Sequence, residues 1–131
     1  MSATEPAFPV LDASVVLAIV QGEPGHELFV DAGPGLVSTV NLAEVRARLS
    51  DRGVDRGGID VALSYIDLHY VDFDVEQAEI SSDLRPLTRG AGLSVGDRAC
   101  LALAMQKNVT AYTADRAWTS IDLPVPIKLI R

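Results

Sequence analysis

Residues 94–107 have the sequence SVGDRACLALAMQK, the most apolar helical stretch of the chain. Small and large apolar side chains follow one another through its second half, so we expect a helix buried at the centre of the fold. Asp97 lies in the first turn, three residues after Ser94, in nearly the pattern of a helix capping box. The stretch therefore predicts a core helix that carries a carboxylate at its amino-terminal end.

Short apolar runs alternate with helical segments on both sides of this helix. This alternation predicts an α/β fold with a central parallel sheet of four to five strands and helices on both faces. The run that follows Asp12 is ambiguous between strand and buried helix, and the helix starters Asp12 and Ser14 favour the helix. We predict strands at 9–12, 36–39, 70–73, 109–113 and 127–130, and helices at 14–20, 23–32, 41–52, 59–69, 74–87, 94–107 and 115–121.

Length and composition indicate one globular domain over residues 1–131, because 48% of the residues are hydrophobic. The net charge of −7 argues against non-specific nucleic-acid binding, which needs a basic surface. A single cysteine, Cys100, fits a cytoplasmic setting. We expect neither a signal peptide nor a membrane span. The two histidines, His26 and His69, give little support to a zinc site.

Four acidic residues lie where a predicted strand passes into a helix or where a helix begins. Such junctions open onto the carboxyl edge of a parallel sheet, where ligands bind. Carboxylates gathered there repel one another, and a divalent cation with oxygen ligands relieves that repulsion. The pattern suggests metal-dependent phosphodiester chemistry. The four residues are Asp12, Glu44, Asp97 and Asp115.

Helix capping is the alternative explanation for each of these acids. Asp12 precedes a helix, Asn41 to Glu44 have the form of a capping box, and acidic first turns are ordinary. Caps are served equally well by Ser, Thr or Asn, so the recurrence of acids favours a shared site. Asp72 and Asp74 compete for the same edge, and Asp122 is a candidate extra ligand.

Arginines follow several of the acids, and they are candidate contacts for substrate phosphates. Arg98 follows Asp97, and Arg116 follows Asp115. Two more, Arg46 and Arg48, follow Glu44 on the helix predicted at 41–52. The alternative for each arginine is an ion pair with a neighbouring acid.

Four segments, in order, resemble the PIN-domain family, and specifically the VapC-type ribonuclease toxins of toxin–antitoxin pairs. They are VLDAS at 10–14, NLAEV at 41–45, LSVGDRACLALA at 93–104 and TADRAW at 113–118. The resemblance implies a PIN-like three-layer sandwich and an endoribonuclease that depends on Mg²⁺ or Mn²⁺. It places the metal-binding acids at Asp12, Glu44, Asp97 and Asp115, and a supporting polar residue at Thr113.

The resemblance also implies partners. A homodimer is expected, together with a small cognate antitoxin of the VapB type that covers the groove and presents a basic side chain to the acids. Thr113, Arg98 and Arg116 are the candidate substrate-binding residues.

Two other functions remain open. One is a receiver-like signalling domain that accepts a phosphoryl group, although Asp12 is followed by Ala13 rather than by a second acid, and Lys128 lies inside the predicted last strand. The other is a catalytically silent binding protein with the PIN fold.

Overall fold

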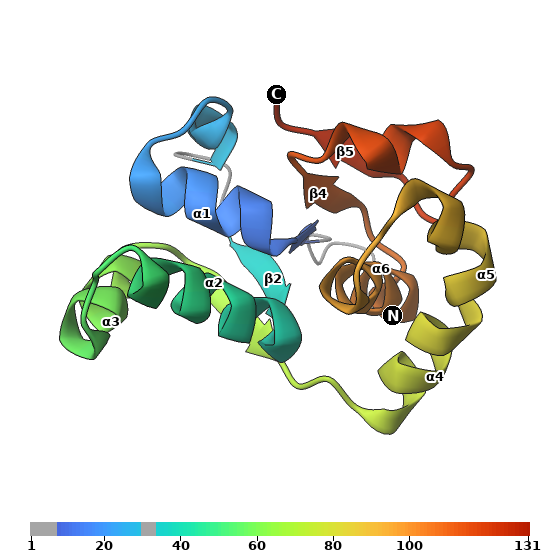
Figure 1. The fold of residues 1–131 in the computed structure, drawn as a ribbon, viewed down its shortest axis with the longest axis horizontal. Helices are drawn as coiled ribbons and strands as arrows, with labels where there is room; N and C mark the ends of the chain where they lie inside the picture. Colours follow the sequence, from blue (N-terminus) through green and yellow to red (C-terminus); the bar gives the residue numbers. More distant parts are fainter. Residues whose placement is uncertain (1–7, 30–33) are drawn as a thin grey trace, which may run out of the picture.

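The computed structural model describes residues 8–29 and 34–131 (Figure 1). One five-stranded sheet forms its centre, with every strand pair parallel and the order β3-β2-β1-β4-β5. This confirms the predicted α/β class and the parallel sheet. The strands are β1 (Val10–Leu11), β2 (Gly35–Ser38), β3 (Leu68–Val71), β4 (Ala111–Thr113) and β5 (Ile127–Leu129).

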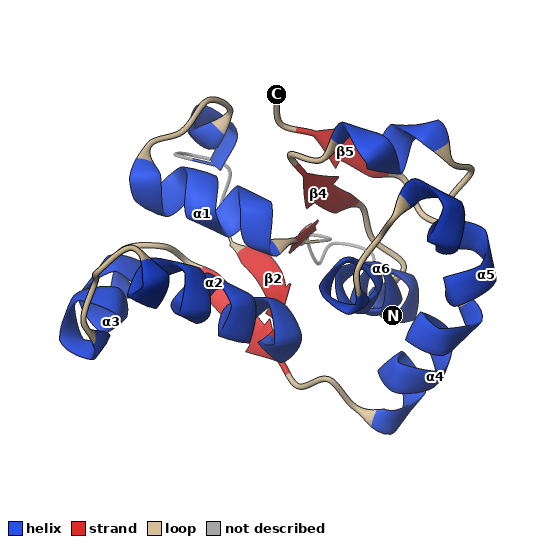
Figure 2. Cartoon of the chain, in the orientation of Figure 1, coloured by secondary structure: helices blue, strands red, loops and turns tan. Residues whose placement is uncertain are grey.

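Helices cover both faces of the sheet, as Figure 2 shows. One apolar cluster joins a face of the sheet to α1, α2 and α3, and a second joins the opposite face to the end of α4, α6 and η3. The molecule is therefore a three-layer sandwich. The helical segments are α1 (Ala13–Gln21), η1 (His26–Phe29), α2 (Thr39–Asp51), α3 (Arg56–Ser64), α4 (Val75–Asp83), α5 (Arg85–Thr88), η2 (Arg89–Ala91), α6 (Val95–Lys107) and η3 (Arg116–Ser120).

Strand β1 shows how the two cores arise from one short segment. Successive side chains of a strand point to opposite faces. Val10 belongs to the cluster around α6, and its neighbour Leu11 belongs to the cluster around α1; both are fully buried. A central parallel strand with both faces covered is apolar without alternation, as the sequence VL is.

Helix α6 is the central helix that its sequence predicts. Its residues 99–104 are fully buried, and it contacts β1, β2 and β4 as well as α2 and α4. Ser94 is its N-cap, and Asn108, in the left-handed conformation, ends it. No helix of the described residues is long and apolar enough to cross a membrane.

The strand order creates a crevice beside β1. The chain passes from β1 outward to β2 and β3, and α6 then carries it back to β4 on the other side of β1. Ligands of open α/β sheets bind outside the carboxyl ends of the strands at such a reversal. Asp12 follows β1 and Asp115 follows β4 shortly after its end, so both residues lie at this place.

Several predicted boundaries are wrong. The helix predicted at 59–69 is α3, which begins earlier and ends at Ser64, and residues 68 and 69 belong to β3 instead. The helix predicted at 74–87 is divided at Leu84 into α4 and α5. The ambiguous run after Asp12 is helical, as predicted.

The segment predicted as a helix at 23–32 contains only the 3-10 turn η1 among its described residues, and 30–32 lie outside them. Gly25 has φ +94°, and a Cβ there would overlap the carbonyl oxygen of Ile130. The close approach of the chain end at Ile130 thus requires a glycine in a conformation that an α-helix does not contain.

Candidate active site

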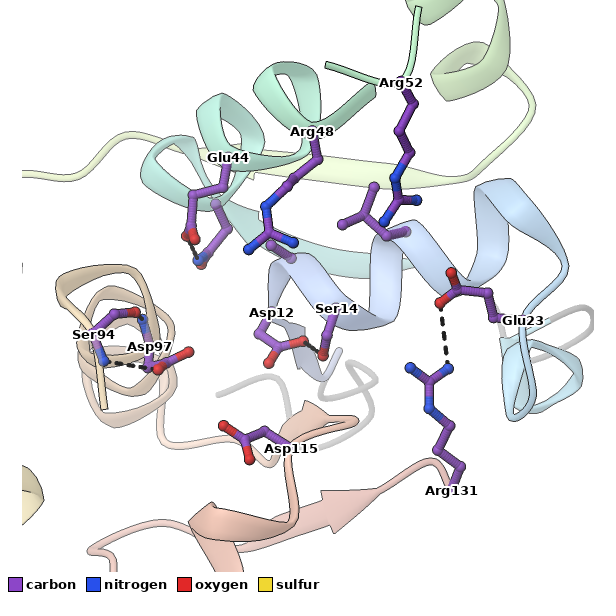
Figure 3. A pocket seen from close by; sticks show the side chains of 13 residues that line it. Asp12, Ser14, Glu23, Glu44, Arg48, Arg52, Ser94, Asp97, Asp115 and Arg131 are labelled. Atoms are coloured by element: carbon purple, nitrogen blue, oxygen red, sulfur yellow. Dashed lines mark hydrogen bonds and ion pairs between the residues drawn. The ribbon is translucent and has the colours of Figure 1, made fainter. Parts of the chain in front are cut away.

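An open pocket of about 430 Å³ is bordered by all four predicted acids (Figure 3). Each comes from a different part of the chain: Asp12 from the end of β1, Glu44 from α2, Asp97 from the first turn of α6, and Asp115 from the residues after β4. Residues separated by more than a hundred positions are therefore gathered in one cavity, as the sequence predicts.

Asp12 is the most buried of the four, with 4% of its surface exposed. Its Oδ1 accepts hydrogen bonds from the Ser14 hydroxyl at 2.6 Å and from the Val15 amide at 3.0 Å, and Oδ2 accepts from the Thr113 hydroxyl at 2.6 Å. Burial raises the pKa of Asp12 to about 6, although these hydrogen bonds act in the opposite direction. Asp12 is also the N-cap of α1, as the capping alternative predicts, and it borders the pocket.

Thr113 supports Asp12 from the neighbouring strand. Its side chain is fully buried, donates to Asp12 and accepts a hydrogen bond from the Asp115 amide at 3.0 Å. The Ser14 hydroxyl accepts from the Ala114 amide at 3.0 Å. These contacts fix the ends of β1 and β4 against each other. Thr113 is thus placed to position acids, and its burial does not suit the predicted contact with substrate.

Glu44 is held between α2 and α6. Its Oε1 accepts from the Asn41 side-chain amide at 2.9 Å, and the same amide nitrogen donates to the Gly96 carbonyl at 3.0 Å. A Cβ on Gly96 would overlap Glu44 Oε1. The capping explanation of Glu44 is wrong, because α2 begins earlier and Ser38 is its N-cap.

Asp97 takes part in the capping box that its sequence predicts. Its Oδ2 accepts from the Ser94 amide at 2.8 Å, and the Ser94 hydroxyl accepts from the Asp97 amide at 3.2 Å. Within the described residues its Oδ1 makes no hydrogen bond, and the carboxylate borders the pocket (Figure 3). Asp115 is exposed and caps η3 through a 2.9 Å hydrogen bond from the Ala117 amide.

The donor set suits a hard cation, since carboxylate and amide oxygens border the pocket. Asn41 adds Oδ1, which is buried and has no hydrogen-bond partner among the described residues. As they stand, no three His, Cys, Asp or Glu side chains in 8–29 and 34–131 lie close enough together to hold one ion directly. Mg²⁺ usually keeps several waters and takes only one or two carboxylates directly.

Some predicted residues lie outside the pocket. Arg98 and Arg116 do not border it, and Arg98 Nε donates to the Ser94 carbonyl at 3.4 Å. The competing acids do not border it either: Asp72, Asp74 and Asp122 are exposed elsewhere.

Three arginines border the pocket: Arg48, Arg52 and Arg131. Only the first of them was named from the sequence. Arg48 and Arg52 follow Glu44 at intervals of four residues, so helical geometry places all three on one side of α2. That spacing was a usable sequence signal. Arg131, which also borders the pocket, arrives there only because the chain end folds back over Gly25.

The fold and the site together define a doubly wound α/β domain with four carboxylates at its switch point. A family model for the PIN domain matches residues 10–123. The chain therefore belongs to the PIN-domain family.

Solved structures share this fold at low sequence identity. The VapBC2 structure from Rickettsia felis, bound to a promoter DNA fragment, matches with a TM-score of 0.70 and 18% identity, over 92% of this chain and 97% of that one. DNA-bound VapBC from Salmonella typhimurium matches with a TM-score of 0.72 and 17% identity, over 96% and 100%.

A third similar structure is VapC20 from Mycobacterium tuberculosis, described as a toxin that cleaves the Sarcin-Ricin loop. It matches with a TM-score of 0.67 and 16% identity, over 89% of this chain and 98% of that one. No curated protein sequence matches the chain.

Proposed function

We propose that this protein is a metal-dependent endoribonuclease and the toxin of a toxin–antitoxin pair. One observation carries the proposal: Asp12, Glu44, Asp97 and Asp115, from four separate elements, border a single pocket at the switch point of the sheet. Membership of the PIN-domain family and the fold shared with VapC toxins support it.

Asp12, Glu44, Asp97 and Asp115 are the residues that would hold Mg²⁺ or Mn²⁺. When bound, the metal supplies an activated water and neutralises charge on the phosphodiester. The hydroxyls of Ser14 and Thr113 keep the Asp12 carboxylate oriented, and Asn41 keeps Glu44 in place against α6. Cys100 does not act as a nucleophile, because it is fully buried and burial raises the pKa of its thiol well above the ordinary value.

The antitoxin and the second copy of the chain belong to the same proposal. Two of the similar structures are toxin–antitoxin complexes by description, from Klebsiella pneumoniae and, in the VapBC form, Salmonella typhimurium. An antitoxin segment that places a basic side chain in the acidic pocket would block both metal and RNA. Such a segment has the charge that the pocket favours.

The receiver-like alternative does not agree with the strand order. Receiver domains have the order 2-1-3-4-5, which puts the acid after the third strand beside the first strand. Here β2 separates β3 from β1, and Asp72, just after β3, does not border the pocket. Lys128 lies within β5, as predicted, and is exposed.

Replacing Asp97 with Asn tests the proposal. The Asn side-chain oxygen can still accept the hydrogen bond from the Ser94 amide, so the helix cap is kept while the charge is lost. We expect Asp97→Asn to reduce cleavage of total bacterial RNA and structured ribosomal RNA fragments in Mg²⁺ by at least about a hundredfold. Its circular dichroism spectrum and melting temperature should match those of the parent within a few degrees.

Asp122→Asn is the matched control, because Asp122 is exposed and does not border the pocket. It makes the same charge change and should cleave RNA at the parent rate. Parental cleavage by the Asp97→Asn protein would refute the assignment of Asp97.

A further inference from the structure

Three arginine side chains border the pocket; in Figure 3, Arg52 and Arg131 lie on the side away from Asp97, and Arg48 lies between Arg52 and Glu44. Arg48 lies on α2, Arg52 is the residue that ends α2, and Arg131 follows β5. In the close view their guanidinium groups point into the space in front of α1. We call this group, Arg48, Arg52 and Arg131, the arginine edge.

The guanidinium groups of the arginine edge are only partly neutralised. Arg52 Nη1 donates to the neutral side chain of Gln21. Arg131 Nη1 lies 3.4 Å from Glu23 Oε1 and donates to the Pro24 carbonyl at 3.1 Å. Arg48 is exposed and makes no hydrogen bond or ion pair within the described residues.

Arg46, on the same helix, is neutralised by an acid, in contrast to Arg48. Arg46 Nη1 forms an ion pair with Asp60 Oδ1 at 2.8 Å, and both residues border a different pocket. Arg48 stands four residues after Glu44, which is the usual spacing for a helical ion pair, yet Glu44 is bound to Asn41 instead. Arg48 thus remains available for a ligand.

The net negative charge of the chain explains why RNA binding would need the arginine edge. At a net charge of −7 the protein as a whole repels nucleic acid. A strand that reaches the carboxylates needs local cations to hold its phosphates. Guanidinium groups bind phosphate oxygens in pairs of parallel hydrogen bonds, which a neutral surface cannot offer.

We propose that the arginine edge is a phosphate-binding subsite, which holds the RNA backbone next to the scissile bond. The RNA strand crosses the mouth of the pocket from Arg131 and Arg52, past Arg48, to the acids. Phosphate contacts position a strand without reading its sequence, so the edge supplies affinity and register. This inference rests on the proposed ribonuclease function and names the residues that hold its substrate.

The alternative role of the arginine edge is to neutralise the carboxylates of the pocket within the protein itself. If the arginines served only to balance the carboxylates, their removal would change metal affinity or stability and leave RNA affinity unchanged. RNA binding and metal binding therefore have to be measured separately, on the full chain.

The experiment uses Arg48→Gln and the double variant Arg48→Gln/Arg52→Gln. Arg56→Gln is the matched control, because Arg56 is exposed, loses the same charge and does not border the pocket. RNA binding is measured by fluorescence anisotropy in the Asp97→Asn background, at several salt concentrations. The ligand is a labelled, uncleaved fragment of structured ribosomal RNA. Mn²⁺ binding is measured by calorimetry without RNA.

We expect Arg48→Gln to weaken RNA binding about tenfold and the double variant about a hundredfold, with Mn²⁺ affinity changed less than twofold. For each phosphate that the variant no longer neutralises, the slope of log K against log salt should fall by about 0.7, the value for single strands. In the cleaving protein, KM should rise while kcat changes little. Arg56→Gln should resemble the parent in all of these measurements.

RNA affinity and salt slope equal to the parent's in the double variant would overturn the subsite. A change in Mn²⁺ affinity with unchanged RNA affinity would also overturn the subsite, and it would show that the arginines neutralise the carboxylates. Loss of affinity for a polyglutamate peptide with unchanged RNA binding would assign the edge to an acidic protein partner. If Asp97→Asn cleaves RNA while the arginine variants lose RNA binding, the catalytic assignment fails and the subsite stands.

Discussion

Burial of the ionised Asp12 carboxylate destabilises the folded protein when no metal is bound. The side chain is 4% exposed, and burial raises its pKa from 3.8 to about 6. The folded state therefore binds the Asp12 proton more tightly than the unfolded state does. The stability that protonated Asp12 allows is fully present below the unfolded pKa and is lost as the pH rises through about 6.

Asp12→Asn should remove this dependence on pH. One pKa unit corresponds to about 1.4 kcal/mol, so in EDTA at pH 7.5 the variant should be more stable than the parent by about 1–3 kcal/mol. At pH 3.5 the two should be nearly equal. Urea denaturation at both pH values measures the difference, and a parallel loss of stability in both proteins would contradict the explanation.

The junction of α2 and α6 determines where Glu44 lies. Asn41 links the two helices by donating to both Glu44 and the Gly96 carbonyl, and Gly96 leaves room for the Glu44 carboxylate. The contact joins elements that cover opposite faces of the sheet. The position of this acid thus depends on how the two helices pack.

Gly96→Ala should separate stability from activity at this junction. Alanine favours a helix over glycine by about 1 kcal/mol, while its Cβ would displace the flexible end of Glu44. We expect unchanged or slightly higher thermal stability and a loss of about 10–100-fold in Mn²⁺ affinity and RNA cleavage. Gly90→Ala is the control, because a Cβ there meets no atom within 4 Å. Full activity of Gly96→Ala would show that Glu44 need not occupy its present position.

Elements with strong local patterns were predictable from sequence, and those defined by distant contacts were not. The start and end of α6 follow from its apolar run and from Ser94 and Lys107. A strand was predicted at 70–73, but β3 spans Leu68–Val71; it is an edge strand with no fully buried residue, so pairing with β2 defines its bounds. The extent of η1 depends on the approach of Ile130 to Gly25, which local sequence does not contain.

At the scale of the whole molecule, the four acids were predictable because topology alone brings strand ends to one edge. Their partners were not predictable to the same extent. Thr113 and Asp12 are 101 positions apart, and the hydrogen bond between them depends on the pairing of β1 with β4. The arginine edge likewise needs Arg131, which no local pattern brings to the same pocket as α2.

A divalent cation should stabilise the whole protein, because it binds the folded pocket and relieves repulsion among its carboxylates. At a Mn²⁺ concentration one hundred times the Kd, linkage gives about 2.7 kcal/mol, which corresponds to several degrees in the melting temperature. The increase should be absent in Glu44→Gln and in EDTA. No Mn²⁺-dependent shift and no calorimetric binding would favour a catalytically silent member of the family.

The pairing of β1 with β4 fixes one side of the pocket, whereas the other side is formed by helices that can shift. Asp12 and Asp115 follow adjacent strands, whose separation of about 4.8 Å is set by backbone hydrogen bonds. Glu44 and Asp97 are carried by helices, where a small slide or a rotamer change moves a carboxylate without breaking the sheet. In the proposed metal site, the carboxylates on the helices are therefore the ones that can adjust to an ion, while the separation of the two strand ends stays fixed.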